Sequence, residues 1–422
     1  MSTRRNSVEL PAKKDGAIAN MESRLSILNV SQNHFVRGGS DSYFLSLGEL
    51  LAQHGNSVVP FCARSERDLP SDWTSFFPIG ANFESPSALD VVRYHYSSAA
   101  RKNLKELVSR NRFDVAHLHI YYGKLTSSIL PVLKDARIPI VQTVHDYKLI
   151  CPVYTCSRGG EPCEACHGKE YWRALVHRCN RGSYLRSAIS MSESYVSRWL
   201  GSVDAIDRFV AVSRFFAEKM KENGIDSQKI SVVPNFIDVT RFARQEEAGR
   251  YFVYFGRIEQ SKGIGTLLEA FRRLPDIPLI VVGEGGFLAQ ARTLATDSAN
   301  IRFVGFKRGS ELYALVAGAV ASILPAEAYE NCPMSILETF ALGRPVIGAR
   351  IGGVPELIEH GQDGYIFEPK DADSLSLFVR MVWAQRAKSE MGNAARSKVE
   401  RQFSADVHYR RIRALYDSLS AY

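Results

Sequence analysis

The chain has 422 residues and a formal net charge of +8, with 45% hydrophobic and 23% charged residues. At ~100–200 residues per domain, this length predicts two domains. The composition is that of a soluble globular protein, which excludes a mostly disordered chain and a small disulfide-rich protein. No apolar run reaches the ~18 residues that a membrane-spanning helix needs.

The N-terminal segment is polar and charged, and we expect residues 1–22 to form a flexible tail. It lacks the apolar stretch of a secretory signal, and Met21 is an alternative start because a strand-like run follows it at once. The absence of a signal predicts a cytoplasmic protein, in which the seven cysteines are thiols or metal ligands rather than disulfides.

Short apolar runs alternate with helical patterns along the whole chain. The runs that predict strands are 25–30, 57–62, 114–120, 138–144, 209–212, 230–233, 251–256, 278–282, 301–304, 321–324, 345–348 and 364–367. Helical patterns occupy 43–53, 87–109, 215–222, 265–273, 310–317 and 335–342. This alternation predicts parallel sheets covered by helices, and the continuously apolar strands indicate burial on both faces.

Twelve strands exceed the usual size of one sheet, so we predict two doubly wound α/β domains. Their boundary is expected in residues 234–250, where the pattern lapses. The predicted units are an N-terminal domain over 23–236 with an insertion at 147–200, a C-terminal domain over 237–404, and a helix over 405–422 that packs back on the first domain.

A glycine pair, Gly38 and Gly39, lies between a predicted strand and a predicted helix. Glycines there let backbone N–H groups approach an anion at the helix N-terminus. The alternative is a tight turn without a ligand, and the sequence is not the G-x-G-x-x-G pattern of dinucleotide sites.

Two cations, Arg257 and Lys262, follow the predicted strand 251–256 and precede a helix. An arginine fork and a lysine point charge at this place are suited to holding a diphosphate. The alternative is a pair of solvated surface charges.

The segment 328–348 carries Glu330 in a loop after a strand and Glu338 in the next helix. The start of that helix offers unpaired N–H groups; its first residues are Cys332, Pro333, Met334 and Ser335. Glu338 is suited to accepting two hydrogen bonds from a ribose diol, and Glu330 to contacting a sugar.

Together the E-x7-E spacing, G-R-x4-K-G at 256–263, PNFID at 234–238 and GGVPE at 352–356 resemble family 4 of the retaining glycosyltransferases. The resemblance covers about residues 25–410 and implies the GT-B fold, two Rossmann-like domains facing across a cleft. It also implies a UDP- or GDP-sugar donor and catalysis without a metal. One departure is Asn331-Cys332-Pro333, where the family often has Gly-Phe-Gly.

The resemblance further implies a role for each matching residue. Arg257 and Lys262 would neutralise the donor diphosphate, Glu338 would bind its ribose and Glu330 the transferred sugar. His145, at a strand end, matches a histidine that contacts the donor sugar, and Gly38 and Gly39 match the loop that closes over donor and acceptor. Val304, Gly305 and Phe306 would border the base.

Five cysteines fall within residues 151–179, and Cys163-x-x-Cys166 has the spacing of a structural zinc knuckle. Cys151 and Cys179 complete a set of four, with Cys156, His167 and His177 as substitutes. The cluster predicts a structural zinc site; the alternative is a group of free thiols in a loop. We expect no catalysis by these cysteines.

Residues 171–200 combine five arginines with tryptophans and tyrosines, and residues 101–200 hold 16 Lys+Arg against 8 Asp+Glu. A basic and aromatic helix suits the surface of an anionic membrane. The alternative is a helix that packs on its own domain with its arginines in solvent.

These patterns predict a retaining hexosyltransferase that extends a lipid-linked glycan in bacterial surface polysaccharide assembly, such as lipopolysaccharide or exopolysaccharide. It would act in the cytoplasm, peripherally on the inner face of the membrane, and would bind no nucleic acid. The alternatives are a sucrose- or trehalose-type synthase with a soluble acceptor, and a non-enzymatic zinc-dependent nucleic-acid-binding protein.

Overall fold

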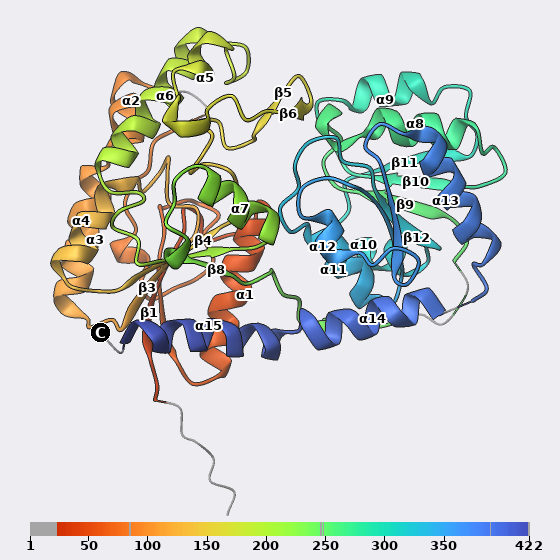
Figure 1. The fold of residues 1–422 in the computed structure, drawn as a ribbon. Helices are drawn as coiled ribbons and strands as arrows, with labels where there is room; N and C mark the ends of the chain where they lie inside the picture. The colour runs from red at the N-terminus through yellow and green to blue at the C-terminus, as the bar shows by residue number, and fades with distance from the viewer. Residues whose placement is uncertain (1–22, 84–85, 245–246, 248, 389, 421–422) are drawn as a thin grey trace, which may run out of the picture.

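The computed structural model describes residues 23–83, 86–244, 247, 249–388 and 390–420. Two α/β domains stand side by side, and helices α14 (Glu390–Gln402) and α15 (Ala405–Ser420) run along one edge of both (Figure 1). The predicted tail 1–22 and the alternative start at Met21 lie outside the described residues.

The first domain is built on a parallel sheet of six strands in the order β2-β1-β3-β4-β7-β8. The strands are β1 (Ser26–Val30), β2 (Ser57–Phe61), β3 (Val115–Leu118), β4 (Ile140–Val144), β7 (Arg208–Ala211) and β8 (Ile230–Val232). The helices are α1 (Gly39–Gln53), α2 (Ala88–His95), α3 (Ser98–Arg110), α4 (Leu130–Asp135) and α7 (Arg214–Glu222). The order reverses between β1 and β3, as in doubly wound folds.

The second domain also has a parallel sheet of six strands, but in the order β11-β10-β9-β12-β13-β14. Its strands are β9 (Phe252–Phe255), β10 (Leu279–Val282), β11 (Ile301–Gly305), β12 (Ala321–Leu324), β13 (Val346–Ala349) and β14 (Gly364–Phe367). Its helices are α8 (Ile264–Arg272), α9 (Leu288–Leu294), α10 (Gly309–Ala317), α11 (Met334–Ala341), α12 (Val354–Leu357) and α13 (Ala372–Ala384). Counted within the domain this is the order 3-2-1-4-5-6, which is the Rossmann arrangement.

The sequence prediction of two doubly wound domains is therefore confirmed, and all twelve predicted strands are present. Every residue of β3, β4, β9, β10 and β12 is buried. Continuous burial is the reason that these strands read as unbroken apolar runs.

The prediction of one helix over 87–109 is wrong, because the chain forms α2 and α3 there. Tyr96 between them is extended, with φ −150° and ψ 111°. The side chain of Ser97 then accepts a hydrogen bond from the N–H of Ala100 and caps α3. Capping by serine at a non-helical position begins a new helix and interrupts the pattern.

The chain crosses between the domains twice. It leaves the first sheet at Val232, enters the second at Phe252, and returns along α14 and α15. The two crossings are bonded to each other, since the N–H of Ile237 donates to the carbonyl of Phe403 (2.9 Å) and Ile237 pairs with Ser404. Helix α15 then packs on the first domain, where Tyr416 is buried in a cluster with β1 and α1.

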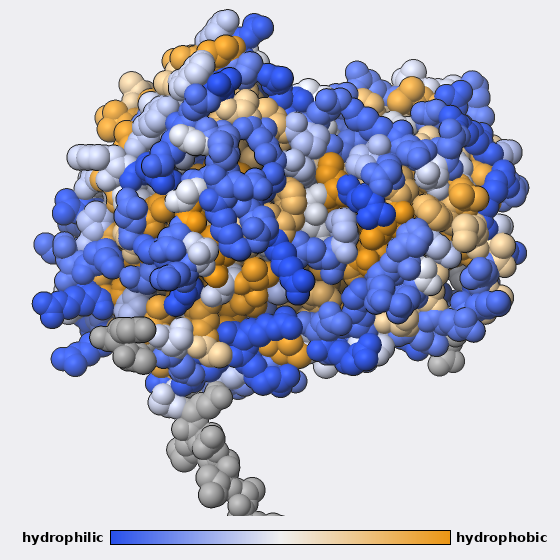
Figure 2. Space-filling view, viewed as in Figure 1, coloured by the Kyte–Doolittle hydropathy of each residue, from blue (hydrophilic) through white to orange (hydrophobic). Residues whose placement is uncertain are grey.

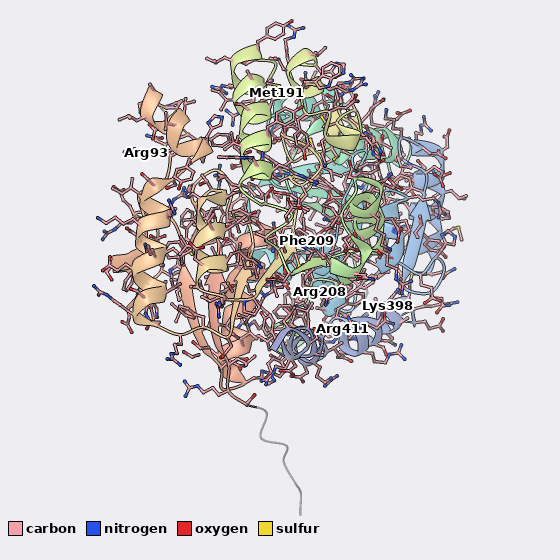
Figure 3. The ribbon with its side chains drawn as sticks, turned by 60° about the vertical axis from the view of Figure 1, so that its left-hand side comes forward. Arg93, Met191, Arg208, Phe209, Lys398 and Arg411 are labelled. Atoms are coloured by element: carbon pink, nitrogen blue, oxygen red, sulfur yellow. The ribbon has the colours of Figure 1, made fainter. Side chains whose placement is uncertain are left out.

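The insertion after β4 begins with a short hairpin of two strands of two residues each, β5 (Ser157–Arg158) and β6 (Glu161–Pro162). Helices α5 (Arg173–Val176) and α6 (Tyr184–Trp199) follow it. Figure 3 shows Met191 of α6 and Arg93 of α2 at the upper end of the first domain, with Lys398 and Arg411 on the two C-terminal helices at the lower edge. No helix of the described residues is both long and apolar enough to cross a membrane.

Candidate active site

Two loops of the second domain flank the point where its strand order reverses, between β9 and β12. The loop after β9 carries Lys262, and the loop after β12 carries Glu330. Lys262 Nζ lies 2.5 Å from Glu330 Oε1, and both side chains are partly buried. Open α/β sheets bind ligands at this place, and here they bring together the cation and the carboxylate that the sequence singled out.

Backbone packs directly on backbone in these loops. Gly263 has φ 71°, and a Cβ there would lie 1.7 Å from the carbonyl oxygen of Pro325. Gly283 has φ 140°, and its Cβ would lie 1.9 Å from the carbonyl oxygen of Gly256. Only glycine fits at both positions, so the loops after β9, β10 and β12 form one closely packed platform.

The other predicted donor residues border this platform. Arg257 lies two residues after the end of β9 and is exposed, and the hydroxyl of Tyr254 donates to its backbone carbonyl (2.6 Å). Val304 and Gly305 end β11, and the carbonyl of Gly305 accepts from the N–H of Gly283 (2.9 Å). Phe306 follows them with 62% of its surface exposed, as a residue that borders a base would need.

Helix α11 begins directly after the Glu330 loop, with Pro333 at its N-cap and Met334 as its first residue. Cys332 before it is buried, and Ser335 is partly buried in its first turn. Burial raises the pKa of Glu338 to about 7. A partly exposed carboxyl group with little polar compensation is suited to a ligand that donates hydrogen bonds.

In the first domain, His145 follows β4, is partly buried, and packs against the buried rings of His119 and Tyr43. Its Nε2 lies 3.0 Å from Nδ1 of His119, and the two rings are stacked with centroids 5.3 Å apart. The ring of Tyr43 meets His145 edge-on at 4.9 Å. Burial lowers the pKa of His145 to about 3, so its imidazole is neutral at pH 7 and can hydrogen-bond a sugar hydroxyl without carrying charge.

The glycine pair sits at the start of α1, opposite the second domain. Gly38 and Gly39 are exposed, and a Cβ on Gly39 would lie 3.8 Å from Cγ of Met334 in α11. Asp41 fixes the turn because its carboxylate accepts hydrogen bonds from the N–H groups of Arg37 and Gly38, both at 3.1 Å. The glycine loop of one domain therefore faces the helix N-terminus of the other.

Three contacts across the domain interface were not predicted from the sequence. Ser213 Oγ donates to Asn331 Oδ1 (2.7 Å), and Asn235 Nδ2 donates to the carbonyl of Cys332 (2.9 Å). The carboxylate of Glu356 accepts from the N–H groups of Arg214 and Phe215 at the start of α7, at 2.8 and 2.6 Å. The residues that replace Gly-Phe-Gly thus hold the first domain, and the Glu of GGVPE caps one of its helices.

A buried polar network behind His145 was also missed. His117 Nδ1 lies 2.5 Å from the hydroxyl of Tyr416, and the hydroxyl of Tyr43 lies 2.8 Å from Nε2 of His408. Burial lowers the pKa of His117 and of His408 to about 3. The available signal was the alternation of His117, in β3, with His119 just after it, but Tyr416, which bonds His117, lies 299 residues away in the chain.

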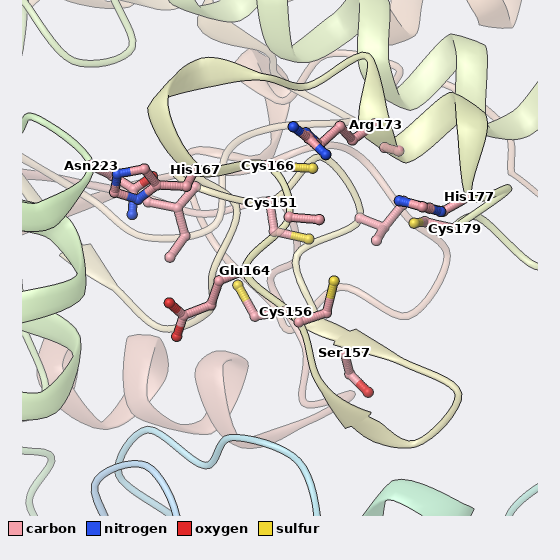
Figure 4. A pocket seen from close by; sticks show the side chains of 15 residues that line it. Cys151, Cys156, Ser157, Glu164, Cys166, His167, Arg173, His177, Cys179 and Asn223 are labelled. Carbon is pink, nitrogen blue, oxygen red and sulfur yellow. The ribbon is translucent and has the colours of Figure 1, made fainter.

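The predicted zinc ligands lie together but do not form a finished metal site. Cys151, Cys163, Cys166 and Cys179 line one cavity, with Cys156, His167 and His177 also in its wall (Figure 4). In the described part of the chain, no three His, Cys, Asp or Glu side chains are arranged so that they could hold a metal ion. Zinc therefore stays a prediction.

Helix α6, in the basic and aromatic stretch, buries polar side chains and exposes large apolar ones. Its buried residues are all polar: Ser187, Ser190, Glu193, Ser194 and Ser197. Its exposed residues include Tyr184, Leu185 and Trp199, with exposed fractions of 61%, 72% and 83%. Figure 2 shows apolar side chains at the upper left, where Figure 1 draws α2 and α6. The buried ion pair of Lys148 and Glu193 anchors the polar face.

Two Rossmann-like domains whose loops meet, with the glycine loop of one beside the N-terminus of α11 in the other, have the arrangement of the GT-B class of glycosyltransferase folds. The sequence profile of Glycosyl transferases group 1 matches residues 237–398, and that of Glycosyltransferase Family 4 matches residues 37–241. The chain belongs to family 4 of the glycosyltransferases.

Curated relatives agree with this family. The amylovoran biosynthesis glycosyltransferase AmsK of Erwinia amylovora is 26% identical over 226 residues, which are 50% of this chain and 56% of the relative. The glycogen synthase of Mycobacterium tuberculosis is 32% identical over 247 residues, 54% of this chain and 59% of the relative. The chain thus spans less than two thirds of the length of these relatives.

Solved structures share the fold over nearly the whole chain. Anabaena HepE, crystallised in complex with UDP, has a TM-score of 0.65 and 16% identity, covering 93% of this chain and all of HepE. Sucrose-phosphate synthase from Thermosynechococcus elongatus has a TM-score of 0.70 and 18% identity, covering 94% of this chain and all of the synthase.

Proposed function

We propose that the protein is a retaining glycosyltransferase that moves a hexose-type sugar from a UDP- or GDP-sugar to a growing, lipid-linked glycan in bacterial surface polysaccharide biosynthesis. The observation that carries the proposal is the contact of Lys262 with Glu330 beside the N-terminus of α11. In this contact Lys262 supplies the positive charge that a leaving diphosphate needs, and Glu330 supplies the carboxylate that can bind a sugar. Both residues lie where the strand order of the second sheet reverses. The name of AmsK supports a polysaccharide product, and the UDP complex of HepE supports a nucleotide donor.

In the proposed reaction, the bond between the anomeric carbon and the diphosphate oxygen breaks. Negative charge grows on the leaving diphosphate and is stabilised by Arg257, Lys262 and the N–H groups that begin α11. The acceptor hydroxyl attacks from the same face of the sugar, and its proton passes to the leaving phosphate oxygen. Glu330 and the neutral His145 hold sugar hydroxyls, and no step needs a metal ion.

The experiment that tests the donor site is a thermal-shift panel of UDP, GDP, ADP and their common sugars. A ligand at ~100 times its Kd should stabilise the protein by about 2.7 kcal/mol. We expect a shift with one base, weakened in Glu338→Ala. Turnover of the selected sugar nucleotide with a lipid-linked acceptor then tests transfer, and the anomeric configuration of the product tests retention. No shift with any nucleotide would contradict the proposal.

We further propose that α6 rests on the inner face of the cell membrane. A helix that buries serines and exposes Tyr184, Leu185 and Trp199 is unfavourable in water alone. The exposed Arg181 and Arg186 beside them suit anionic lipid headgroups. Flotation at low salt with phosphatidylglycerol vesicles should carry the wild type and not Leu185→Ser/Trp199→Ser. Failure of the wild type to float would reject the membrane role and leave the donor-site proposal untouched.

A further inference from the structure

Three separate pieces of the insertion bring cysteines to the wall of one cavity. Cys151 comes from the loop after β4, Cys163 and Cys166 follow the β5–β6 hairpin, and Cys179 follows α5. The side chains of Cys151, Cys166 and Cys179 face a common space in Figure 4. Five of the seven cysteines of the chain meet here, which chance placement in a loop does not explain.

The sulfur of Cys151 is surrounded by hydrogen-bond donors. The N–H groups of Val153, Thr155 and Cys156 donate hydrogen bonds to its Sγ, and the thiol of Cys156 is bonded to it as well. Several backbone N–H groups on one sulfur stabilise a thiolate. In the proposed site Cys156 donates its thiol hydrogen bond to Cys151 and is not itself a ligand.

The insertion also holds backbone conformations that need an anchor. Eight non-glycine residues of the described chain have positive φ, and five of them lie between residues 154 and 181. Each such residue costs of the order of 1 kcal/mol or more unless the surroundings fix it. The strands β5 and β6 are only two residues long, so regular secondary structure supplies little of that support. Small units of this kind are commonly held by a metal.

We propose that Cys151, Cys163, Cys166 and Cys179 bind one structural zinc ion. Because the described side chains do not yet stand in a ligand arrangement, binding requires rotation of the thiols into the cavity that they line. Four sulfurs at about 2.3 Å would complete a tetrahedral site, and the thiol protons are released to solvent as the thiolates form.

The ion would also fix one wall of the donor site. The hairpin and the knuckle contact the second domain, since Glu161 pairs with Lys370 and the hydroxyl of Tyr329 donates to Glu164 Oε1 (2.7 Å). A Cβ on Gly160 would lie 3.4 Å from the side chain of Gln260, two residues before Lys262. Zinc in the first domain would thus hold the insertion against the diphosphate loop of the second.

Zinc content measured by elemental mass spectrometry tests the assignment, on protein purified without a metal-chelating tag. We expect ~1 zinc per chain in the wild type, and loss of most of it in Cys163→Ser and in Cys179→Ser. The matched variants Cys156→Ser, inside the cluster, and Cys62→Ala, buried far from it in sequence, should keep their zinc. A metal-free wild type, or full zinc content in Cys163→Ser, would overturn the proposal.

A second measurement does not depend on whether the variants fold. Cobalt(II) added to wild-type protein from which zinc has been removed should give the absorption bands of tetrahedral thiolate coordination, and zinc should abolish them. Octahedral cobalt spectra alone would overturn the four-thiolate site. Neither measurement uses turnover, so both outcomes are independent of the proposed transferase activity.

Discussion

The loops with which the two domains approach each other differ in construction. In the second domain, a Cβ on Gly263, Gly283 or Gly352 would lie within 2.1 Å of a backbone oxygen. In the first domain, a Cβ on Gly38 meets nothing within 4 Å, and one on Gly39 meets only the side chain of Met334. The comparison indicates that the loops of the second domain are packed backbone on backbone, whereas the glycine loop of the first, held by Asp41, has open space beside it.

The largest expected effect tests the platform. Gly263→Ala forces a side chain into the carbonyl of Pro325 at a positive φ, and we expect a loss of about 3–5 kcal/mol in unfolding free energy. Urea denaturation followed by circular dichroism measures it. The matched variant Gly38→Ala should change stability by less than about 0.5 kcal/mol. Equal effects of the two substitutions would remove the contrast between the domains.

The next effect concerns the ion pair on the platform. Lys262→Ala removes the cation nearest Glu330, and we expect kcat to fall by about 100- to 1,000-fold, with a smaller change in the KM for the donor. Steady-state kinetics with the donor found by the thermal-shift panel measures both. Lys221→Ala, a surface lysine paired with Glu218 on α7, is the control and should behave as wild type. A change confined to KM would argue against a role in the leaving of the diphosphate.

A smaller effect follows from the pKa of Glu338, raised by burial from 4.5 to about 7. In the proposed donor site this carboxylate accepts the hydrogen bonds of the ribose, so nucleotide affinity should fall about tenfold between pH 8 and pH 6. Without nucleotide, this group favours the folded state below pH 4.5, and the benefit is lost as pH rises through 7. Glu338→Gln should therefore stabilise the ligand-free protein at pH 8.

Calorimetric titration and thermal unfolding across this pH range check both statements. Glu338→Gln is expected to bind nucleotide weakly at every pH, with little dependence on pH. A wild-type affinity that stays constant from pH 6 to pH 8 would contradict the assigned role of Glu338.

The smallest effect lies between the domains. Glu356→Gln keeps the shape of the side chain but removes the charge at the N-terminus of α7. We expect a loss of about 0.5–1 kcal/mol in unfolding free energy, together with a change in kcat if the contact holds the domains in register. Urea denaturation measures the unfolding free energy, and steady-state kinetics measures kcat. The matched control is Glu359→Gln, at an exposed glutamate three residues further along the chain.

The fold was predictable because local pattern and burial agree. The inner strands of both sheets are buried on two faces and therefore appear in the sequence as short apolar runs. The carboxyl ends of β9 and β12 then locate Lys262 and Glu330. The network of His117, Tyr416 and His408 was not predictable, because His117 and Tyr416 are 299 residues apart in the chain. Their pairing depends on where α15 returns, which no local pattern specifies. The interruption of the helix at Tyr96 was not predictable either, because the helical spacing of apolar residues continues from α2 into α3.

The two crossings between the domains have a mechanical consequence. Ile237 and Phe403 are hydrogen-bonded side by side, so the two covalent connections between the domains lie next to each other and can act as one hinge. Rotation about that line changes few backbone bonds, whereas twisting or sliding would pull the paired segments apart. Opening and closing should therefore follow a single arc, and one pair of spectroscopic labels across the interface would be enough to follow it.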